Sequence, residues 1–129
     1  MVKYSTGKEE KEILPNLLGF DNQKDIEASE FEGFLMAELI LTEKLNSKTR
    51  FSVKYILNLH KLSLGHLYSF AGKYRNVNMS KGGFLFPASK FIAENMKVFD
   101  EEILSKLPNK YTEKADLIID IAKVHGELL

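Results

Sequence analysis

The chain has 129 residues and a mass of 14.7 kDa, the size of one domain with its own hydrophobic core. Its 44% apolar and 28% charged residues are ordinary for a globular domain, and no apolar run is long enough to span a membrane. The absence of cysteine excludes disulfides, thiolate metal sites and a cysteine nucleophile. The first residues lack the apolar run of a signal peptide, so we expect a cytoplasmic protein.

The acidic and basic residues balance in number, but they are unevenly distributed. Segment 44–93 contains no Asp or Glu. Its basic residues are Lys44, Lys48, Arg50, Lys54, Lys61, Lys73, Arg75, Lys81 and Lys90. This excess predicts a local positive potential suited to phosphate or another anion. The alternative is a solvated basic face balanced by acidic neighbouring helices.

The N-terminal part divides into an arm and a helix. Residues 1–20 are interpreted as an extended arm, because Pro15 and Gly19 interrupt the apolar sequence ILPNLLGF. Residues 21–129 then form a single helical domain, whose first helix is capped by Asp21 or Asn22 and ends near Asn46. The apolar residues expected on its broad face are Phe31, Phe34, Leu35, Leu39, Leu41 and Leu45. Gly33 costs this helix about 1 kcal/mol relative to Ala, so it calls for a packing or functional explanation.

A second helix and a hairpin follow. Ser52 caps the helix VKYILNLHKLSLGHLYSF, residues 53–70. One face of this helix carries Val53, Ile56, Leu57, His60, Leu64 and Leu67. Apolar residues alternate with their neighbours in NVNMS and in FLF, and this pattern predicts two short strands. The glycines of SKGG, between them, suit a tight turn with positive φ.

Two more helices complete the pattern. The third begins at Pro87 or Ser89 and runs to Leu107. Its apolar stripe is Ile92, Met96, Phe99, Ile103 and Leu107. The fourth begins at Thr112 and has no stop signal before Leu129, so we expect a domain that is incomplete at its C-terminal end. Open apolar faces on the second and fourth helices then predict aggregation or dimerisation.

Residue chemistry by itself shows no complete active site. His60 and His125 fall on apolar helix faces, and His66 lies on a more polar side where solvation suffices. Metal-ligand spacing is absent, and the lone KGG lacks the rest of a P-loop. The hairpin is the better indication, because two short strands without other partners can pair with an extended segment of another protein. The alternative is a hairpin that only covers the helical core with Phe84 and Phe86.

The order of these segments resembles the Fic (filamentation induced by cAMP) family. The matching stretch is LHKLSLGHLYSFAGKYRNVNMSKGGFLFPASKFIAENM, residues 59–96, followed by the helix that ends in AKVHGELL. The resemblance covers residues 51–129, and more loosely the helix from Asp21. It implies a mainly α, Fic-like helical bundle with one short β-hairpin, which is called the flap in that family.

The resemblance also implies an activity. Most Fic proteins transfer AMP from ATP, with Mg²⁺, to a Ser, Thr or Tyr hydroxyl of a target protein, and the flap aligns the target segment by main-chain pairing. The partner is then a target-protein segment, and Lys81 at the tip could contact target or phosphate. The corresponding docking residues of this chain are Val77, Asn78, Met79, Ser80, Lys81, Gly82, Gly83, Phe84, Leu85 and Phe86.

The signature loop of the family, H-x-F-x-[DE]-G-N-G-R, has no match in the 129 residues. In Fic proteins this loop supplies the base, the Mg²⁺ ligand and the phosphate-binding groups. No catalytic or metal-binding residue is therefore assigned, and the chain is interpreted as the target-docking portion, inactive alone. Some relatives also carry an inhibitory helix with the pattern [ST]-x-x-x-E-[GN]. Glu32 and Gly33 match its end, but Ala28 stands at the Ser/Thr position.

Two other functions remain open from the sequence. A degenerate relative would be a non-catalytic interaction module whose flap still captures a partner strand. Nucleic-acid binding through segment 44–93 is disfavoured, because the net charge is zero and no DNA- or RNA-binding motif is present.

Overall fold

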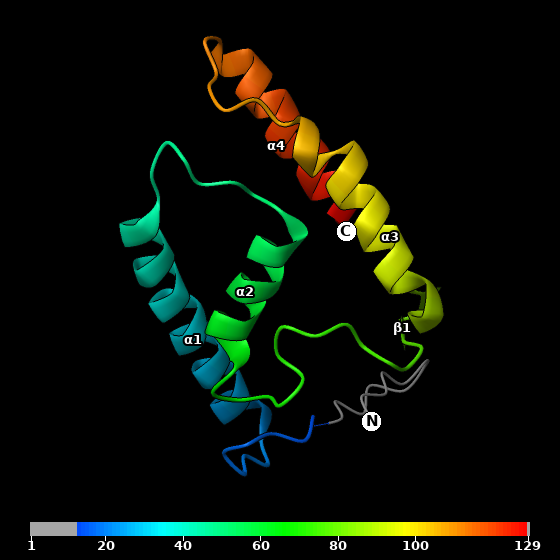
Figure 1. Ribbon diagram of the computed structural model, residues 1–129. Helices are drawn as coiled ribbons and strands as arrows, with labels where there is room; N and C mark the ends of the chain where they lie inside the picture. Colours follow the sequence, from blue (N-terminus) through cyan, green and yellow to red (C-terminus); the bar gives the residue numbers. More distant parts are fainter. Residues whose placement is uncertain (1–12, 129) are drawn as a thin grey trace.

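The computed structural model describes residues 13–128 and is mainly helical (Figure 1). Its elements are α1 (Gln23–Lys44), α2 (Val53–Leu64), β1 (Ser80–Lys81), β2 (Phe84–Leu85), α3 (Ser89–Glu102), the 3₁₀ helix η1 (Leu104–Lys106) and α4 (Lys114–Leu128). The helical fold with one hairpin confirms the predicted fold class. Across the described residues, no helix combines the length and the apolar character needed to cross a membrane.

Helix α1 packs against α2 through small side chains. Asn22 is the N-cap, as predicted, and its side chain accepts a hydrogen bond from Asp25 N (2.9 Å). The buried residues of α1 are Ile26, Ser29, Gly33 and Ala37. The predicted apolar face was wrong, because Phe31, Phe34, Leu35, Leu39 and Leu45 are exposed and Leu41 is only half-buried. Close approach of two helix backbones requires small residues at the contact, so the larger side chains face away.

Gly33 marks the tightest point of this contact. A Cβ atom at this position would lie 1.9 Å from the main-chain oxygen of Ser63 and 2.6 Å from the His66 ring. Ser63 is itself fully buried, and its hydroxyl donates to Leu59 O (2.8 Å) within α2. The helix-propensity cost of Gly33 is therefore offset by packing that no larger residue allows.

The second helix is shorter than predicted. It begins after the Ser52 cap, as expected, but it ends at Leu64 rather than continuing to residue 70. Gly65, a poor helix former, follows, and two turns then bring Leu67 and Tyr68 into the core. Burial of these two side chains, with 0% and 4% of their surface exposed, outweighs the extra helical hydrogen bonds.

The main core cluster lies where the start of α1 meets the end of α2. It consists of Ile26, Leu67 and Tyr68, with Ile13, Leu14, Phe20, Leu64 and Phe70 packed around it. Leu17 N donates to Leu67 O (2.8 Å), and the Asn16 side chain closes the turn by donating to Phe20 O (2.8 Å). Residues 13–20 thus contribute to the core of the domain. The remainder of the predicted arm, residues 1–12, lies outside the described residues.

The third predicted helix divides into two elements. Helix α3 starts at Ser89, within the predicted boundary, but it ends at Glu102 and not at Leu107. At Ile103 the backbone departs from regular helix (φ −113°), and the tighter turn of η1 places Leu104 among the buried residues. The predicted stripe is otherwise confirmed, since Phe99 is buried and its other members are half-buried. Asp100 Oδ1 accepts a hydrogen bond from Val53 N (3.0 Å), which attaches α3 to the start of α2.

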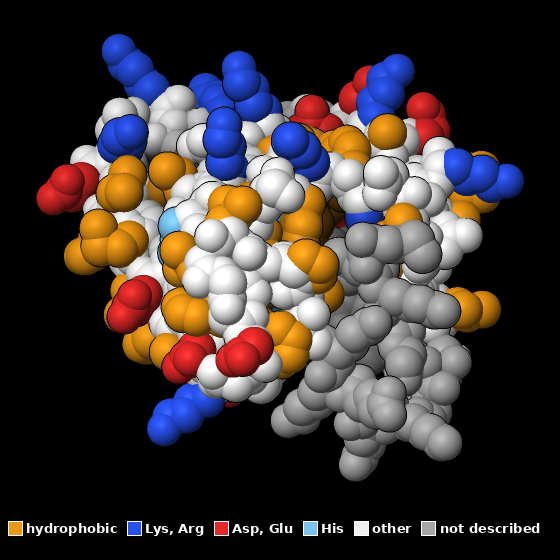
Figure 2. All heavy atoms as spheres, turned by 90° about the horizontal axis from the view of Figure 1, so that it is seen from below, with side chains coloured by type: hydrophobic (Ala, Val, Ile, Leu, Met, Phe, Trp, Pro, Cys, Tyr) orange, Lys and Arg blue, Asp and Glu red, His pale blue; other side chains and the backbone are white. Residues whose placement is uncertain are grey.

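Helix α4 is mostly uncovered. Its described residues include none that is buried, and Ile118, Ile119, Ile121 and Leu128 each expose about half of their surface or more. On the surface seen from below, Figure 2 shows other apolar side chains exposed among charged ones. Dimerisation through such a surface stays a prediction.

The connection from α2 to the hairpin depends on His60. Its Nδ1 accepts a hydrogen bond from Gly72 N (2.8 Å), so the neutral ring carries its proton on Nε2. Burial lowers the pKa of His60 below 6.5, its ordinary value. A protonated Nδ1 could no longer accept from Gly72, so this contact requires the neutral imidazole.

We expect Gly33→Ala to destabilise the fold by about 2 kcal/mol or more, because overpacking at Ser63 O exceeds the gain in helix propensity. Urea unfolding followed by circular dichroism measures the change. Gly126→Ala is the matched control, since a Cβ at that helical position meets nothing within 4 Å. It should raise the free energy of unfolding by up to about 1 kcal/mol. Equal stability of the two variants would contradict the account of the helix contact.

We expect the free energy of unfolding to fall as the pH drops below 6.5. The folded state holds the pKa of His60 low, so the unfolded chain takes up the proton first and acidification favours unfolding. His60→Gln should flatten this part of the pH profile, whereas His125→Gln, at an exposed position, should preserve it. Urea unfolding at several pH values measures the slope. An unchanged slope in His60→Gln would refute this assignment.

Candidate functional site

The hairpin between α2 and α3 is the candidate site. Strands β1 and β2 pair antiparallel, with Ser80 opposite Leu85 and Lys81 opposite Phe84. Gly82 and Gly83 form the two-residue loop with φ of 56° and 79°, as a type I′ turn requires. The predicted hairpin and its glycine turn are confirmed, but residues 76–79 are not a strand and β1 has only two residues. The base of the hairpin departs from strand geometry because side chains, rather than a ladder, hold it.

The hydrogen-bond register defines which main-chain groups are free. Phe86 N donates to Met79 O (3.1 Å), so these residues form a hydrogen-bonded pair. Such pairs alternate with non-bonded ones along an antiparallel ladder, which makes Ser80 and Leu85 a non-bonded pair. Their N–H and C=O groups therefore point outward, and they bond to no other part of residues 13–128. Both edges of the hairpin are open to an added strand.

Two side chains fasten the base of the hairpin to the helical body. Arg75 donates from Nη1 to Val77 O (2.7 Å) and from Nη2 to Pro87 O, so it spans the two strands. Asn78 Oδ1 accepts from Ser89 N (2.8 Å), the first residue of α3. The base is thus fixed while the tip projects, which suits a docking element that must hold one orientation. The sequence pattern did not reveal this role of Arg75, because its acceptors are main-chain oxygens that carry no sequence signal.

The hairpin has one apolar face. Phe84 and Phe86 make an edge-to-face contact with ring centroids 5.2 Å apart, and Met79 is opposite Phe86. Phe84 is 62% exposed and Leu85, on the other face, is 78% exposed. These rings therefore do not simply cover the helical core. The predicted contact of Lys81 with target or phosphate stays a prediction, because the side chain of Lys81 lies outside the described part of the structure.

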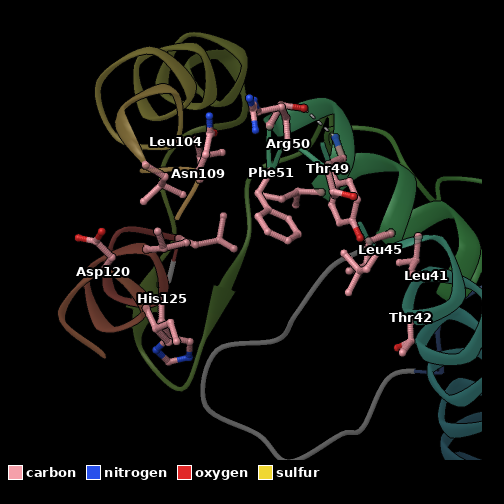
Figure 3. Close-up of a pocket in the computed structure, with 18 of the residues that line it drawn as sticks. Leu41, Thr42, Leu45, Thr49, Arg50, Phe51, Leu104, Asn109, Asp120 and His125 are labelled. Atoms are coloured by element: carbon pink, nitrogen blue, oxygen red, sulfur yellow. Dashed lines mark hydrogen bonds between the residues drawn. The ribbon is translucent and has the colours of Figure 1, made fainter. Parts of the chain in front are cut away.

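A wide apolar groove lies between α1 and α2 on one side and η1 and α4 on the other. Its volume is about 1150 Å³. Figure 3 shows Leu41, Leu45 and Phe51 across the space from Leu104 and His125. At the margin of the groove, the Tyr111 hydroxyl donates a hydrogen bond to Asp120 Oδ2 (2.7 Å). This hydrogen bond is the main reason why the pKa of Tyr111 is raised above its ordinary value. The groove is lined largely by carbon, so it suits an apolar occupant better than a charged ligand.

The other candidate residues are not gathered at the hairpin. Glu32 is exposed on α1, while its neighbour Glu30 accepts from Tyr68 Oη (2.8 Å). His66 is more than a solvated side chain, since its Nε2 donates to Ser29 O (3.0 Å) and links α2's end to α1. Within residues 13–128, no three His, Asp or Glu side chains converge to hold a metal ion.

We expect Arg75→Gln to loosen the hairpin without unfolding the domain, because both carbonyl contacts at its base are lost. The Phe86 amide should exchange with solvent about tenfold faster. Tyr68 N, which donates to Leu64 O in the core, should be unaffected. Lys73→Gln, at an exposed position nearby, is the control variant. Hydrogen exchange followed by NMR measures these rates. An unchanged exchange rate of the Phe86 amide in Arg75→Gln would exclude the role of Arg75 in fastening the hairpin base.

Comparison with known proteins places this geometry in a recognised fold. No protein-family model and no curated protein matches the chain. Among solved structures, the chain is similar to the N-terminal Fic domain of a VirB-translocated effector protein from Bartonella sp. AR 15-3, with 23% identity and a TM-score of 0.73. That match covers 94% of this chain and 60% of the other.

A second similar structure is the FIC domain of a VirB-translocated effector protein from Bartonella clarridgeiae. The identity is 20% and the TM-score 0.66, over 97% of this chain and 61% of that one. The chain thus spans about 60% of the length of these solved structures. Four helices, the hairpin between the second and third, and near-complete superposition together establish that this chain has a Fic-like fold.

Proposed function

We propose that this chain is the target-docking part of a Fic-type protein adenylyltransferase, which transfers AMP from ATP to a Ser, Thr or Tyr hydroxyl of another protein. The fold supports the family relationship, and the hairpin supports the docking role. The observation that carries the proposal is a hairpin whose base is fixed by Arg75 and Asn78 while its edges stay open.

The physical basis of docking is β-strand addition. An extended segment that pairs with a strand edge gains main-chain hydrogen bonds regardless of its sequence, and side-chain contacts then supply selectivity. A rigid base lowers the conformational entropy lost on binding, so more of the contact energy appears as affinity. The flap would thereby hold a target hydroxyl in one position relative to the transferred phosphate.

The described residues of this chain do not fit ATP and Mg²⁺ as a complete site. They contain no cluster of three carboxylate or imidazole ligands, and Arg75 already bonds two main-chain carbonyls. We therefore assign ATP and Mg²⁺ to the signature loop of a complete Fic protein and derive no chemical step for residues 13–128. Glu32 is exposed and available to pair with an arginine of such a loop, which is the inhibitory role proposed for it.

A non-catalytic interaction module is the second candidate function. It rests on the same hairpin edges, which can pair with a partner strand without any nucleotide-binding group. Such a module would capture a partner strand at the hairpin and would need no nucleotide. The two functions differ in one measurable respect, because only the transferase modifies its partner covalently.

The test is an AMP-transfer assay of the full-length gene product, expressed from the complete reading frame to which this chain belongs. We expect target proteins incubated with it, ATP and Mg²⁺ to gain one AMP on a hydroxyl side chain, detected by mass spectrometry. Residues 1–129 alone should give no modified product, since the phosphate-stabilising groups are missing and the rate falls by several powers of ten.

Absence of a signature-like loop in the longer reading frame would reject the transferase. Partner binding at residues 76–87 that is unchanged by ATP would then favour the interaction module. A longer protein that has the loop but transfers no AMP would instead point to another phosphate-containing group.

A further inference from the structure

Basic side chains follow one another along the outer face of α2. Lys54 and Lys61 are two helical turns apart, so they project from the same side of the helix, about 10 Å from each other along its axis. Asn58 lies between them, and all three side chains are exposed. Ser63, which is fully buried where α2 meets α1, projects from the opposite side of the helix. The basic face therefore points away from α1.

The connection to the hairpin adds a third lysine to this face. His60 Nδ1 accepts a hydrogen bond from Gly72 N (2.8 Å), and a Cβ atom at Gly72 would lie 2.8 Å from Lys61 Cβ. The main chain at residue 72 thus packs on the stem of Lys61, and Lys73 follows with an exposed side chain. This packing restricts the Lys61 stem, so less side-chain entropy is lost when its ammonium group meets a partner. The basic row is defined as Lys54, Asn58, Lys61 and Lys73.

The basic row has no acidic counterpart in the described structure. Segment 44–93 contains no Asp or Glu, and the three lysines of the row form no ion pair within residues 13–128. The carboxylate of Asp100 reaches the start of α2, but its Oδ1 accepts a main-chain N–H there (3.0 Å). Figure 2 shows Lys and Arg side chains gathered in the upper left part of the surface seen from below. Acidic neighbours therefore do not balance the row through ion pairs.

The chemistry of the basic row selects the class of partner. Its exposed side chains are all polar, whereas attachment to a bilayer surface also requires apolar side chains that enter it. Strong nucleic-acid binding uses many phosphate contacts, and the row offers three cations in a chain whose net charge is zero. Carboxylates of a protein need only local pairing, and the amide of Asn58 can add a hydrogen bond. Charge complementarity thus favours an acidic protein segment.

We propose that the basic row, on the face of α2 opposite α1, is a contact surface for an acidic segment of a protein partner. Lys54 and Lys61 pair with carboxylates that are two helical turns apart on the partner, or equally spaced along an extended segment, and Lys73 pairs with a further one beside Lys61. This surface is separate from the hairpin edges, and the inference does not depend on AMP transfer. Exposed charge pairs contribute mainly to the rate and selectivity of association, so we expect weak, salt-dependent binding.

The test uses the complete 129-residue chain labelled with ¹⁵N and a short peptide in which alanines separate several glutamates. The control peptide has glutamine in place of every glutamate. We expect the acidic peptide to shift the amide signals of Asn58, Lys61 and Lys73, and the control peptide to leave them unchanged. Raising the salt concentration from about 0.05 M to about 0.5 M should weaken binding about tenfold, because salt screens exposed charges.

Charge-reversal variants locate the contact. Lys61→Glu combined with Lys73→Glu should weaken binding of the acidic peptide about tenfold or more, since attraction becomes repulsion. The matched control combines Lys97→Glu with Lys106→Glu, two exposed positions outside the row, and should change binding less than about twofold. Helix signals in the NMR spectrum report whether each variant folds. Lys73→Glu alone leaves the packed Lys61 stem in place and should still weaken binding about threefold.

Each contrary result has a definite meaning. Equal binding of the two peptides, or equal losses in the two double variants, would overturn the basic row as a surface for acidic groups. Binding of single-stranded DNA, or of phosphatidylserine vesicles but not phosphatidylcholine vesicles, in place of the acidic peptide would assign the row to another class of partner. AMP transfer by the full-length gene product is measured separately, so either result leaves the proposed function intact.

Discussion

The close contact between Gly33 of α1 and the main chain of Ser63 in α2 is the constraint on which the packing of the α1–α2 pair depends. Two helices can approach this closely only where one of them has no side chain, since a Cβ at Gly33 would lie 1.9 Å from Ser63 O. The contact places the end of α2 against the start of α1, where Leu67 and Tyr68 close the core around Ile26. The rest of the connection to the hairpin leaves from this fixed point.

Hydrogen bonds from side chains to main-chain atoms fix the orientation of the hairpin. His60 holds Gly72 next to α2, Arg75 spans the hairpin base, and Asn78 bonds the first residue of α3. Each of these side chains binds a backbone atom outside β1 and β2, so no strand edge near the tip is consumed. A stable base with an open edge is the combination that strand addition requires, whereas an unsupported two-stranded hairpin is only marginally stable in water.

The apolar surface of the domain is divided between two very different regions. One is the small patch on the hairpin, where Phe84 and Phe86 lie beside polar strand positions. The other is the groove of about 1150 Å³ between the α1–α2 pair and α4, with exposed side chains such as Leu45 and Ile121 at its margins. The chain spans about 60% of the solved Fic domains it resembles. The hairpin is formed by residues close together in the sequence, and none of its described strand residues lines the groove.

The sequence by itself determined the features that depend on neighbouring residues: the helix caps at Asn22 and Ser52, the Gly82–Gly83 turn, and the half-buried stripe of α3. It also indicated that a hairpin stands between the second and third helices. Tertiary structure decided which face of α1 is buried, where α2 ends and how the hairpin is fastened. These outcomes depend on backbone atoms distant in sequence, such as Ser63 O for Gly33 and Pro87 O for Arg75. Main-chain acceptors are identical at every residue, so periodicity and composition cannot identify them before the chain is folded.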